Sequence, residues 1–427
     1  MSGKKTSPAR RATFVRAVVS RQFHTDYLRL SFLLPLRRRT AAAAALLSNL
    51  LRRGTARHPD MVSLSRAAEN LYGAAYRLDS QKMGDSLLLT ATVQYPRPGR
   101  IPGGISVVRG ALQLLLEILT EPRLEKGLFP SAVFEHEKRM LALQLEALVN
   151  ARTSYSHGRF LRRFMPRERH RLFEYGDPDA CRALTNRGTV AFWRDVIERR
   201  PLCVFSHGSL DEDALREALR PLLETKRDGA DLPLTHVCRP ARRRLKRVSE
   251  RFAVQDAHLW IGLRGKVCSA DAASIPLAVA NAMYGGLPTS RLFRNVRGRL
   301  GLAYDAHSVL VRTKGAVEVF AGVRARDVER TAEVALGEWE EVQLGRFARK
   351  EFEEVRRFLL HQLRAQADSR AFHAHMAMFS ALHDRATDLD GLLRSLRAVT
   401  PEAVADAALR VRPDTVFVML PEEERGS

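Results

Sequence analysis

The sequence predicts an α/β protein in which one order of strands and helices occurs twice. Two observations predict this fold class: apolar strand patterns alternate with helical patterns, and the second half of the chain repeats the order of the first. The chain has 427 residues, and at about 150 residues per domain this length favours two or three domains. We therefore expect two similar halves, each with its own sheet and helices.

The first half contains four short apolar segments and five helical patterns. Strands are expected at 27–36, 74–79, 86–95 and 202–206, and helices at 41–51, 61–71, 106–119, 131–164 and 212–220. Thr40 can cap the first of these helices, and Gly54 follows its end. Pro130 precedes the long helix, and Pro221 ends the last one.

The second half repeats this order. Strands are expected at 257–264, 302–311, 316–323 and 415–420, and helices at 272–283, 290–297, 327–342 and 349–382. The letters Gly73-Ala74-Ala75-Tyr76 recur as Gly301-Leu302-Ala303-Tyr304. We divide the chain into an N-terminal half (1–225), a basic segment (226–249) and a C-terminal half (250–427).

The positive charge does not by itself choose a function. The net charge is +22, but the basic residues are sixty Arg and ten Lys spread along the whole chain, whereas nucleic-acid-binding proteins concentrate them on one element. The basic segment 226–249 could bind phosphate or an anionic peptide, but its polar composition and Pro240 favour a solvated linker. Nucleic-acid or ribosome association through this segment stays an alternative.

Membrane and secreted classes are disfavoured. No apolar run approaches the roughly 20 residues of a membrane span, and the basic stretch 1–16 lacks an apolar segment and cleavage site, although it could mimic an organellar transit peptide. The cysteines are isolated, with no CxxC pair, which argues against a disulfide framework or a cysteine zinc site and favours the reducing cytoplasm. They are Cys181, Cys203, Cys238 and Cys268.

Motifs for common active sites are absent. The sequence has no GxxxxGK[ST] phosphate loop and no GxSxG nucleophile turn. No two histidines are four residues apart, the spacing that would place both on one helix face for zinc. His373 and His375 are interpreted as surface or packing residues, and His207 as a structural residue at a strand end. We expect no metal site and no cofactor in this chain.

One segment carries a family resemblance. The sequence GGLPTSRLFRNVRGRLGLAY, from Gly285 to Tyr304, resembles the C-terminal signature of the pitrilysin/insulinase metallopeptidases. The resemblance implies two duplicated halves, each a mixed sheet covered by helices. The strand 32–36 and the segments LLRRGT (50–55) and ENLYGA (69–74) are similar to insulinase-family proteins associated with 5-aminopentanol modification of elongation factor P.

The resemblance also implies a zinc motif that has degenerated here. Active members carry HxxEH shortly before a Gly-Thr pair, here Gly54-Thr55, which places the two histidines at Ala45 and Asn49 and the glutamate at Ser48. Alanine has no ligand atom, and serine cannot replace the glutamate that activates water. The distal glutamate ligand, counted from a Glu137-Lys138 pair, falls at Gln144.

The remaining half of the family's active site is present in the sequence. Arg297 and Tyr304 match the arginine and tyrosine that active members use to hold substrate, and guanidinium and phenol groups can donate hydrogen bonds to a developing oxyanion. The resemblance therefore implies a cytoplasmic, non-zinc subunit that supplies these residues to a zinc-bearing HxxEH partner cleaving peptides. The alternative from another class is an inactive structural or scaffold protein.

Overall fold

The computed structural model describes residues 13–422, except 103, 226, 228–236 and 384–387. The chain forms two compact units. Unit 1 consists of Met1–Ala147, Leu172–Leu234 and Ser369–Thr387, and unit 2 of Leu148–Arg171, Thr235–Asp368 and Asp388–Ser427. The basic N-terminal residues 1–12 and much of the expected linker, 226 and 228–236, lie outside the described residues.

Each unit contains one mixed five-stranded sheet, and the two sheets have the same topology. In unit 1 the strands are β1 (Thr13–Val19), β2 (Thr25–Pro35), β3 (Ala75–Met83), β4 (Ser86–Pro96) and β5 (Leu202–Gly208), in the order β1-β5-β2-β4-β3. In unit 2 they are β6 (Lys246–Phe252), β7 (Ala257–Gly265), β8 (Ala303–Val311), β9 (Ala316–Val323) and β10 (Val411–Pro421), in the order β6-β10-β7-β9-β8. The first strand of each sheet pairs in parallel with the last. The predicted α/β fold with two similar halves is confirmed.

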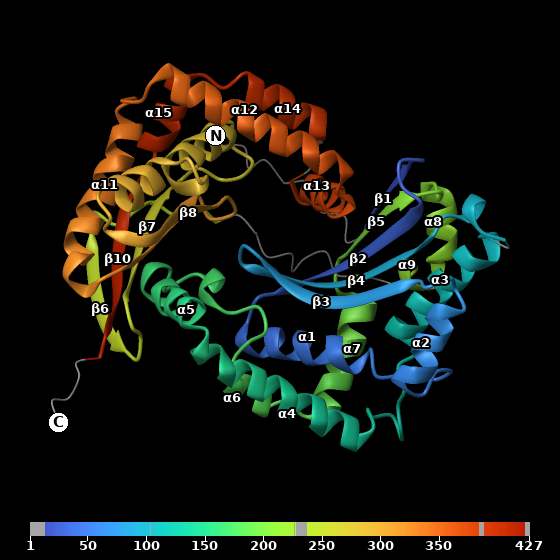
Figure 1. Cartoon of the computed structure of the whole chain (residues 1–427). Helices are drawn as coiled ribbons and strands as arrows, with labels where there is room; N and C mark the ends of the chain where they lie inside the picture. The colour runs from blue at the N-terminus through green and yellow to red at the C-terminus, as the bar shows by residue number, and fades with distance from the viewer. Residues whose placement is uncertain (1–12, 103, 226, 228–236, 384–387, 423–427) are drawn as a thin grey trace, which may run out of the picture. The chain divides into compact units, whose positions relative to one another are not determined.

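Helices pack on both sheets (Figure 1). Unit 1 contains α1 (Arg38–Leu50), α2 (Met61–Glu69), α3 (Gly104–Thr120), α4 (Ser131–Ala147), α6 (Pro178–Arg182), α7 (Asn186–Arg199), α8 (Glu212–Ala218), α9 (Arg220–Leu223) and α13 (Arg370–His383). Unit 2 contains α5 (Arg152–Phe164), α10 (Ser274–Asn281), α11 (Val328–Gln343), α12 (Arg349–Ala365), α14 (Leu389–Arg397) and α15 (Pro401–Leu409). None of the helices in the described part of the chain has the length and apolar character needed to cross a bilayer.

The two long helices expected from the sequence are each interrupted. A 3₁₀ turn at Leu148–Asn150 separates α4 from α5, and another at Gln366–Asp368 separates α12 from α13. After each turn the chain enters the other unit, so α5 belongs to unit 2 and α13 to unit 1. The prediction of two continuous helices was wrong. The helical pattern of apolar residues continues on both sides of each turn, but the helices before and after the turn pack in different units.

Strand β7 shows how the sheet of unit 2 becomes buried on both faces. All nine of its residues are buried, and successive side chains point to opposite faces. Leu259 and Ile261 belong to the larger core with residues of α11 and α15. Trp260 belongs to a second cluster with Phe160 of α5, whose ring stacks on the indole at 5.5 Å.

Close backbone approach allows α5 to lie on this second face. A Cβ atom at Gly262 would lie 2.5 Å from the ring of Phe164, a contact that no other residue type could make without displacing the ring. In unit 1, α13 covers part of its sheet in a similar way: Met378 packs with Leu33 and Leu88. Both sheets therefore receive a helix from the opposite half of the sequence (Figure 1).

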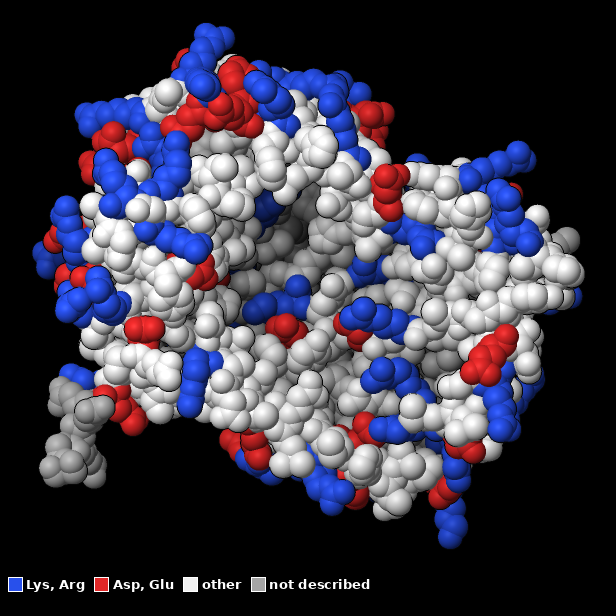
Figure 2. All heavy atoms as spheres, in the orientation of Figure 1, with Lys and Arg blue, Asp and Glu red and all other residues white. Residues whose placement is uncertain are grey.

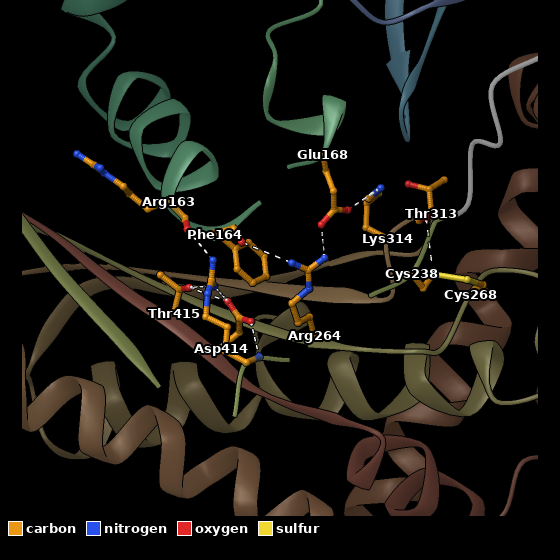
Figure 3. A network of polar contacts seen from close by, with 11 residues as sticks. Arg163, Phe164, Glu168, Cys238, Arg264, Cys268, Thr313, Lys314, Asp414 and Thr415 are labelled. Carbon is orange, nitrogen blue, oxygen red and sulfur yellow. Dashed lines mark hydrogen bonds and ion pairs between the residues drawn. A yellow bond between two sulfur atoms is a disulfide. The ribbon is translucent and has the colours of Figure 1, made fainter. Parts of the chain in front are cut away.

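A buried ionic network fixes the chain after α5 (Figure 3). Glu168, 4 % exposed, accepts a hydrogen bond from the guanidinium of Arg264 and lies 2.7 Å from the Nζ of Lys314, which is fully buried. The carboxylate therefore contacts two buried cations, and it holds the end of segment 148–171 against β7.

Part of the basic segment 226–249, which was predicted to be a solvated linker, is built into the fold. Its last residues, from Lys246, form the first part of β6. Arg242 donates to the carboxylate of Asp414, which is buried, and to the hydroxyl of Thr415 at 2.8 Å. Arg242 also reaches the carbonyl oxygen of Arg163 at 3.3 Å (Figure 3). Among the residues described here, Arg242 is therefore a structural side chain.

The expectation of unpaired cysteines was wrong for one pair. Cys238 and Cys268 form a disulfide, with Cα atoms 5.8 Å apart (Figure 3). Cys238 precedes β6 and Cys268 follows β7, so the fold brings together two residues that are isolated in the sequence. Cys181 and Cys203 are free and buried.

Replacing Glu168 by Gln should strongly destabilise unit 2, because the buried guanidinium of Arg264 would lose the carboxylate that accepts its hydrogen bond. We expect the free energy of unfolding in urea to fall by about 3–5 kcal/mol. The matched control is Glu329→Gln, which breaks the exposed pair with Arg247 at 2.6 Å and should cost less than about 1 kcal/mol. Equal losses in the two variants would contradict a special role for the buried network.

The disulfide should be visible by counting thiols. In denaturant without reductant, two thiols per chain should react, and four should react after reduction. Reduction should lower the free energy of unfolding by about 3–4 kcal/mol, because the bond joins residues separated by 30 positions. A Cys238→Ser, Cys268→Ser variant should match the reduced protein and be insensitive to reductant. Four reactive thiols in the oxidised protein would refute the bond.

Candidate functional site

The candidate site in unit 2 begins at a closely packed pair of glycines. Gly285 and Gly286 end a π-helical turn, Ala282–Gly286, that follows α10. A Cβ atom on Gly285 would lie 2.6 Å from side-chain atoms of Leu292 and Ser308. The glycines therefore let this turn approach both the following helix and strand β8. The glycine pair of the sequence motif is explained by this packing.

The next part of the motif anchors a π-helical segment, Leu292–Arg299. Leu292 is 1 % exposed, and Arg291 contacts the carboxylates of Glu338 at 3.3 Å and Glu351 at 3.2 Å. The Arg291 guanidinium also donates to the carbonyl oxygen of Arg346. The Ser-Arg-Leu-Phe letters of the motif thus hold the segment that carries Arg297.

Arg297 projects from this anchored segment into solvent. Its side chain is exposed, and its guanidinium lies over the ring of Phe293, 4.8 Å from the centroid. The described residues provide no carboxylate partner for it. The cation is therefore held in place by an aromatic ring while its hydrogen-bond donors stay available.

A tight turn and a bulge place Tyr304 after this segment. Gly301 has φ +60°, a left-handed conformation that favours glycine, and Leu302 donates its N–H to the carbonyl oxygen of Val296 at 2.9 Å. Strand β8 then pairs with β9, but the register shifts between Ala303 and Asp305. Tyr304 occupies this bulge on an edge strand, a position at which proteins commonly redirect a side chain.

The surroundings of Tyr304 keep its phenol protonated. The side chain is 55 % exposed, and its ring lies where a Cβ atom of Gly322 would be. Partial burial, together with the charges of Asp256 and Asp305, raises the pKa of the Tyr304 hydroxyl. Asp256 was not identified from the sequence, because a single aspartate before a strand carries no signal. The hydroxyl has no hydrogen-bond partner among the described residues and can donate to a bound group.

The positions that replace the zinc motif lie on α1 in unit 1. Ala45 and Ser48 are buried, and the Ser48 hydroxyl donates to the carbonyl oxygen of Ala44 at 2.9 Å. The side-chain oxygen of Asn49 accepts from the guanidinium of Arg52 at 2.9 Å. Each polar side chain at these positions is therefore engaged by a neighbouring residue of α1 or of the turn that follows it.

The distal positions lie on α4, which contacts α1. Gln144 is exposed, whereas Glu137 is buried and forms an ion pair with Arg53. The one carboxylate here is thus already neutralised. The residues at Ala45, Ser48, Asn49 and Gln144 do not fit a zinc ion, and no cluster of three or more His, Cys, Asp or Glu in the described part of the chain could hold a metal.

The histidines considered in the sequence have packing environments. His207 is the penultimate residue of β5 and is 3 % exposed, and its ring stacks on that of His373 at 5.6 Å. Burial, with the neighbouring charge of His373, lowers the pKa of His207. The structure therefore brings Arg297 and Tyr304 onto adjoining segments of unit 2, while the degenerate zinc positions belong to unit 1.

Comparisons with known proteins found a matching family model and a similar curated protein. Residues 191–359 match the family model described as the peptidase M16 inactive domain. The protein named "Probable inactive metalloprotease YmfF" of Bacillus subtilis strain 168 is 24 % identical over 403 residues, which cover 94 % of each chain.

Two solved structures share the fold. A conserved protein from Enterococcus faecalis V583 matches with a TM-score of 0.91 at 22 % identity, over 98 % of this chain and 99 % of that one. A peptidase M16 inactive domain from Pseudomonas fluorescens matches with a TM-score of 0.76 at 16 % identity, over 96 % of both chains. Residues 191–359 are thus similar to the inactive domain of the M16, or pitrilysin/insulinase, metallopeptidases, and nearly the whole chain is similar to a protein described as a probable inactive metalloprotease.

Proposed function

We propose that this chain is the non-zinc subunit of a heterodimeric M16 peptidase. A partner with an intact HxxEH motif supplies the zinc ion and the general base, and this chain supplies Arg297 and Tyr304 to bind peptide substrate. The proposal extends to maturation of proteins or small peptides, including the pathway that modifies elongation factor P, through the resemblance carried by residues 50–55 and 69–74.

The availability of both donors carries this proposal. Arg297 and Tyr304 have no hydrogen-bond or ion-pair partner among the described residues, yet each is held by defined packing, on Phe293 and over Gly322. A positioned donor that is not used within the fold is what a developing oxyanion requires. The degenerate positions on α1 support the division of roles, because Ala45 and Ser48 offer neither a ligand nor a base.

The proposal predicts that Arg297→Ala and Tyr304→Phe impair peptide cleavage by the complex. Each change removes one donor to the substrate, so kcat/KM should fall about 10- to 100-fold. The measurement uses this chain mixed with the HxxEH-containing M16 protein of the same genome and a fluorogenic peptide library. Both side chains are exposed, so the free energy of unfolding should change by less than about 0.5 kcal/mol.

Two exposed residues of the same types, an arginine and a tyrosine, serve as matched controls. Arg299 is exposed on the same π-helical segment, and Tyr72 is an exposed tyrosine of unit 1. Arg299→Ala and Tyr72→Phe should leave kcat/KM unchanged. If the complex stays stable and the Arg297→Ala and Tyr304→Phe variants cleave peptide at the wild-type rate, the substrate-binding role is refuted and the scaffold alternative is favoured. Stoichiometric zinc with peptidase activity in the isolated chain would refute the division of roles.

A further inference from the structure

A groove between α2 and α3 in unit 1 has the features of a ligand site. It encloses about 470 Å³ and is lined by residues of both helices and of the loop before α2. Pockets that bind small molecules commonly measure about 300–1,000 Å³. The groove lies apart from the degenerate zinc positions of α1, none of which lines it.

The floor of the groove is apolar. Leu114 of α3 is 4 % exposed, and Leu71, which follows α2, lies against the same helix. Gly110 makes this possible, because a Cβ atom there would lie 2.6 Å from the Cδ2 atom of Leu71. The two leucines therefore form a surface on which an aliphatic or aromatic group can pack.

The rim of the groove offers donors that the fold does not use. Arg57 and Arg66 are exposed and have no carboxylate partner within the described residues. The side-chain amides of Asn70 and Gln113 likewise have no hydrogen-bond partner there. In contrast, the nearby Arg123 pairs with Glu125 at 2.8 Å. Two guanidiniums and two amides thus line one cavity, and neither guanidinium has a carboxylate partner among the described residues.

The single carboxylate of the groove is already satisfied. Glu117 is 6 % exposed, it accepts a hydrogen bond from the hydroxyl of Thr55, and its Oε1 atom lies 4.0 Å from Nε2 of His58. Its carboxylate therefore has a hydrogen-bond donor within the fold at one end of the groove. The rim formed by Arg57 and Arg66 keeps an uncompensated positive charge.

We propose that this groove binds an organic carboxylate, with the charged group on Arg57 and Arg66 and an apolar body on Leu71 and Leu114. Arginine forms charge-assisted and often bidentate hydrogen bonds with carboxylates, and Asn70 and Gln113 can donate further bonds. A free carboxylic acid and the C-terminal residue of a peptide share this chemistry. Arg297 and Tyr304, which belong to unit 2, do not line the groove.

The test measures binding to the full chain by titration calorimetry. The probes are 4-phenylbutyrate and N-acetyl-alanyl-leucine, each compared with its uncharged amide. At least one acid should bind with a Kd of about 1 mM or tighter, and its amide at least about tenfold more weakly. Arg57→Gln and Arg66→Gln should each weaken binding of that acid about tenfold.

The matched control is Arg139→Gln, which changes an exposed arginine of α4 that does not line the groove and should leave the affinity unchanged. Binding of phenylbutyrate alone supports a free acid, and binding of the peptide alone supports a C-terminus. The proposal is overturned if neither acid binds at 10 mM, if acid and amide bind equally, or if both groove variants keep wild-type affinity with an unchanged thermal unfolding midpoint.

Discussion

The fit of the Phe164 ring over Gly262 is the contact on which the architecture of unit 2 depends. With no Cβ atom at Gly262, α5 can approach the strands closely enough for Phe160 and Phe164 to cover Trp260. The even-numbered face of β7 thereby becomes a core, and Glu168 can reach Arg264 and Lys314. Without this helix, a face containing Trp260 and Phe320 would be open to water at a large cost in buried apolar area. One face of the unit 2 sheet is therefore covered by α5, a helix from the first half of the sequence.

Several arginines of this arginine-rich chain join parts of the fold. Arg264, Arg291 and Arg242 each join segments distant in sequence through buried or half-buried carboxylates. Figure 2 shows Lys and Arg interspersed with Asp and Glu on the drawn face, with no patch confined to one element. The net charge of +22 is thus a poor guide to function. The informative arginines are the ones that the fold leaves unpaired, such as Arg297.

Periodicity predicted the interior strands and missed two edge strands. Segments such as 86–95 and 316–323 carry apolar residues at every second position, which is a strong strand signal. Strand β6, with the sequence KRVSERF, alternates half-buried and exposed residues, so its sequence resembles a loop. Strand β1, TFVRAVV, is short and follows a basic stretch, and both strands pair on only one side. The residues of the candidate site could be proposed from the sequence, but their arrangement in space could not. Arg297 and Tyr304 follow from the motif, whereas the bulge at Tyr304, the neighbouring Asp256 and the disulfide depend on pairings between segments distant in sequence.

The duplication provides an internal comparison that bears on Tyr304. The repeated letters Gly73-Ala74-Ala75-Tyr76 and Gly301-Leu302-Ala303-Tyr304 both lead into edge strands, β3 and β8, at the same place in sheets of the same topology. Tyr76 pairs with Val93 in an unbroken register, and its hydroxyl donates to the carbonyl oxygen of Ala111 at 3.1 Å. Tyr304 instead lies at a bulge, and its exposed hydroxyl has no partner among the described residues. The topology alone therefore does not require an open phenol at this position. Because packing explains Tyr76 and leaves the Tyr304 hydroxyl unexplained, a bound group outside the fold is the simplest physical reason for the difference.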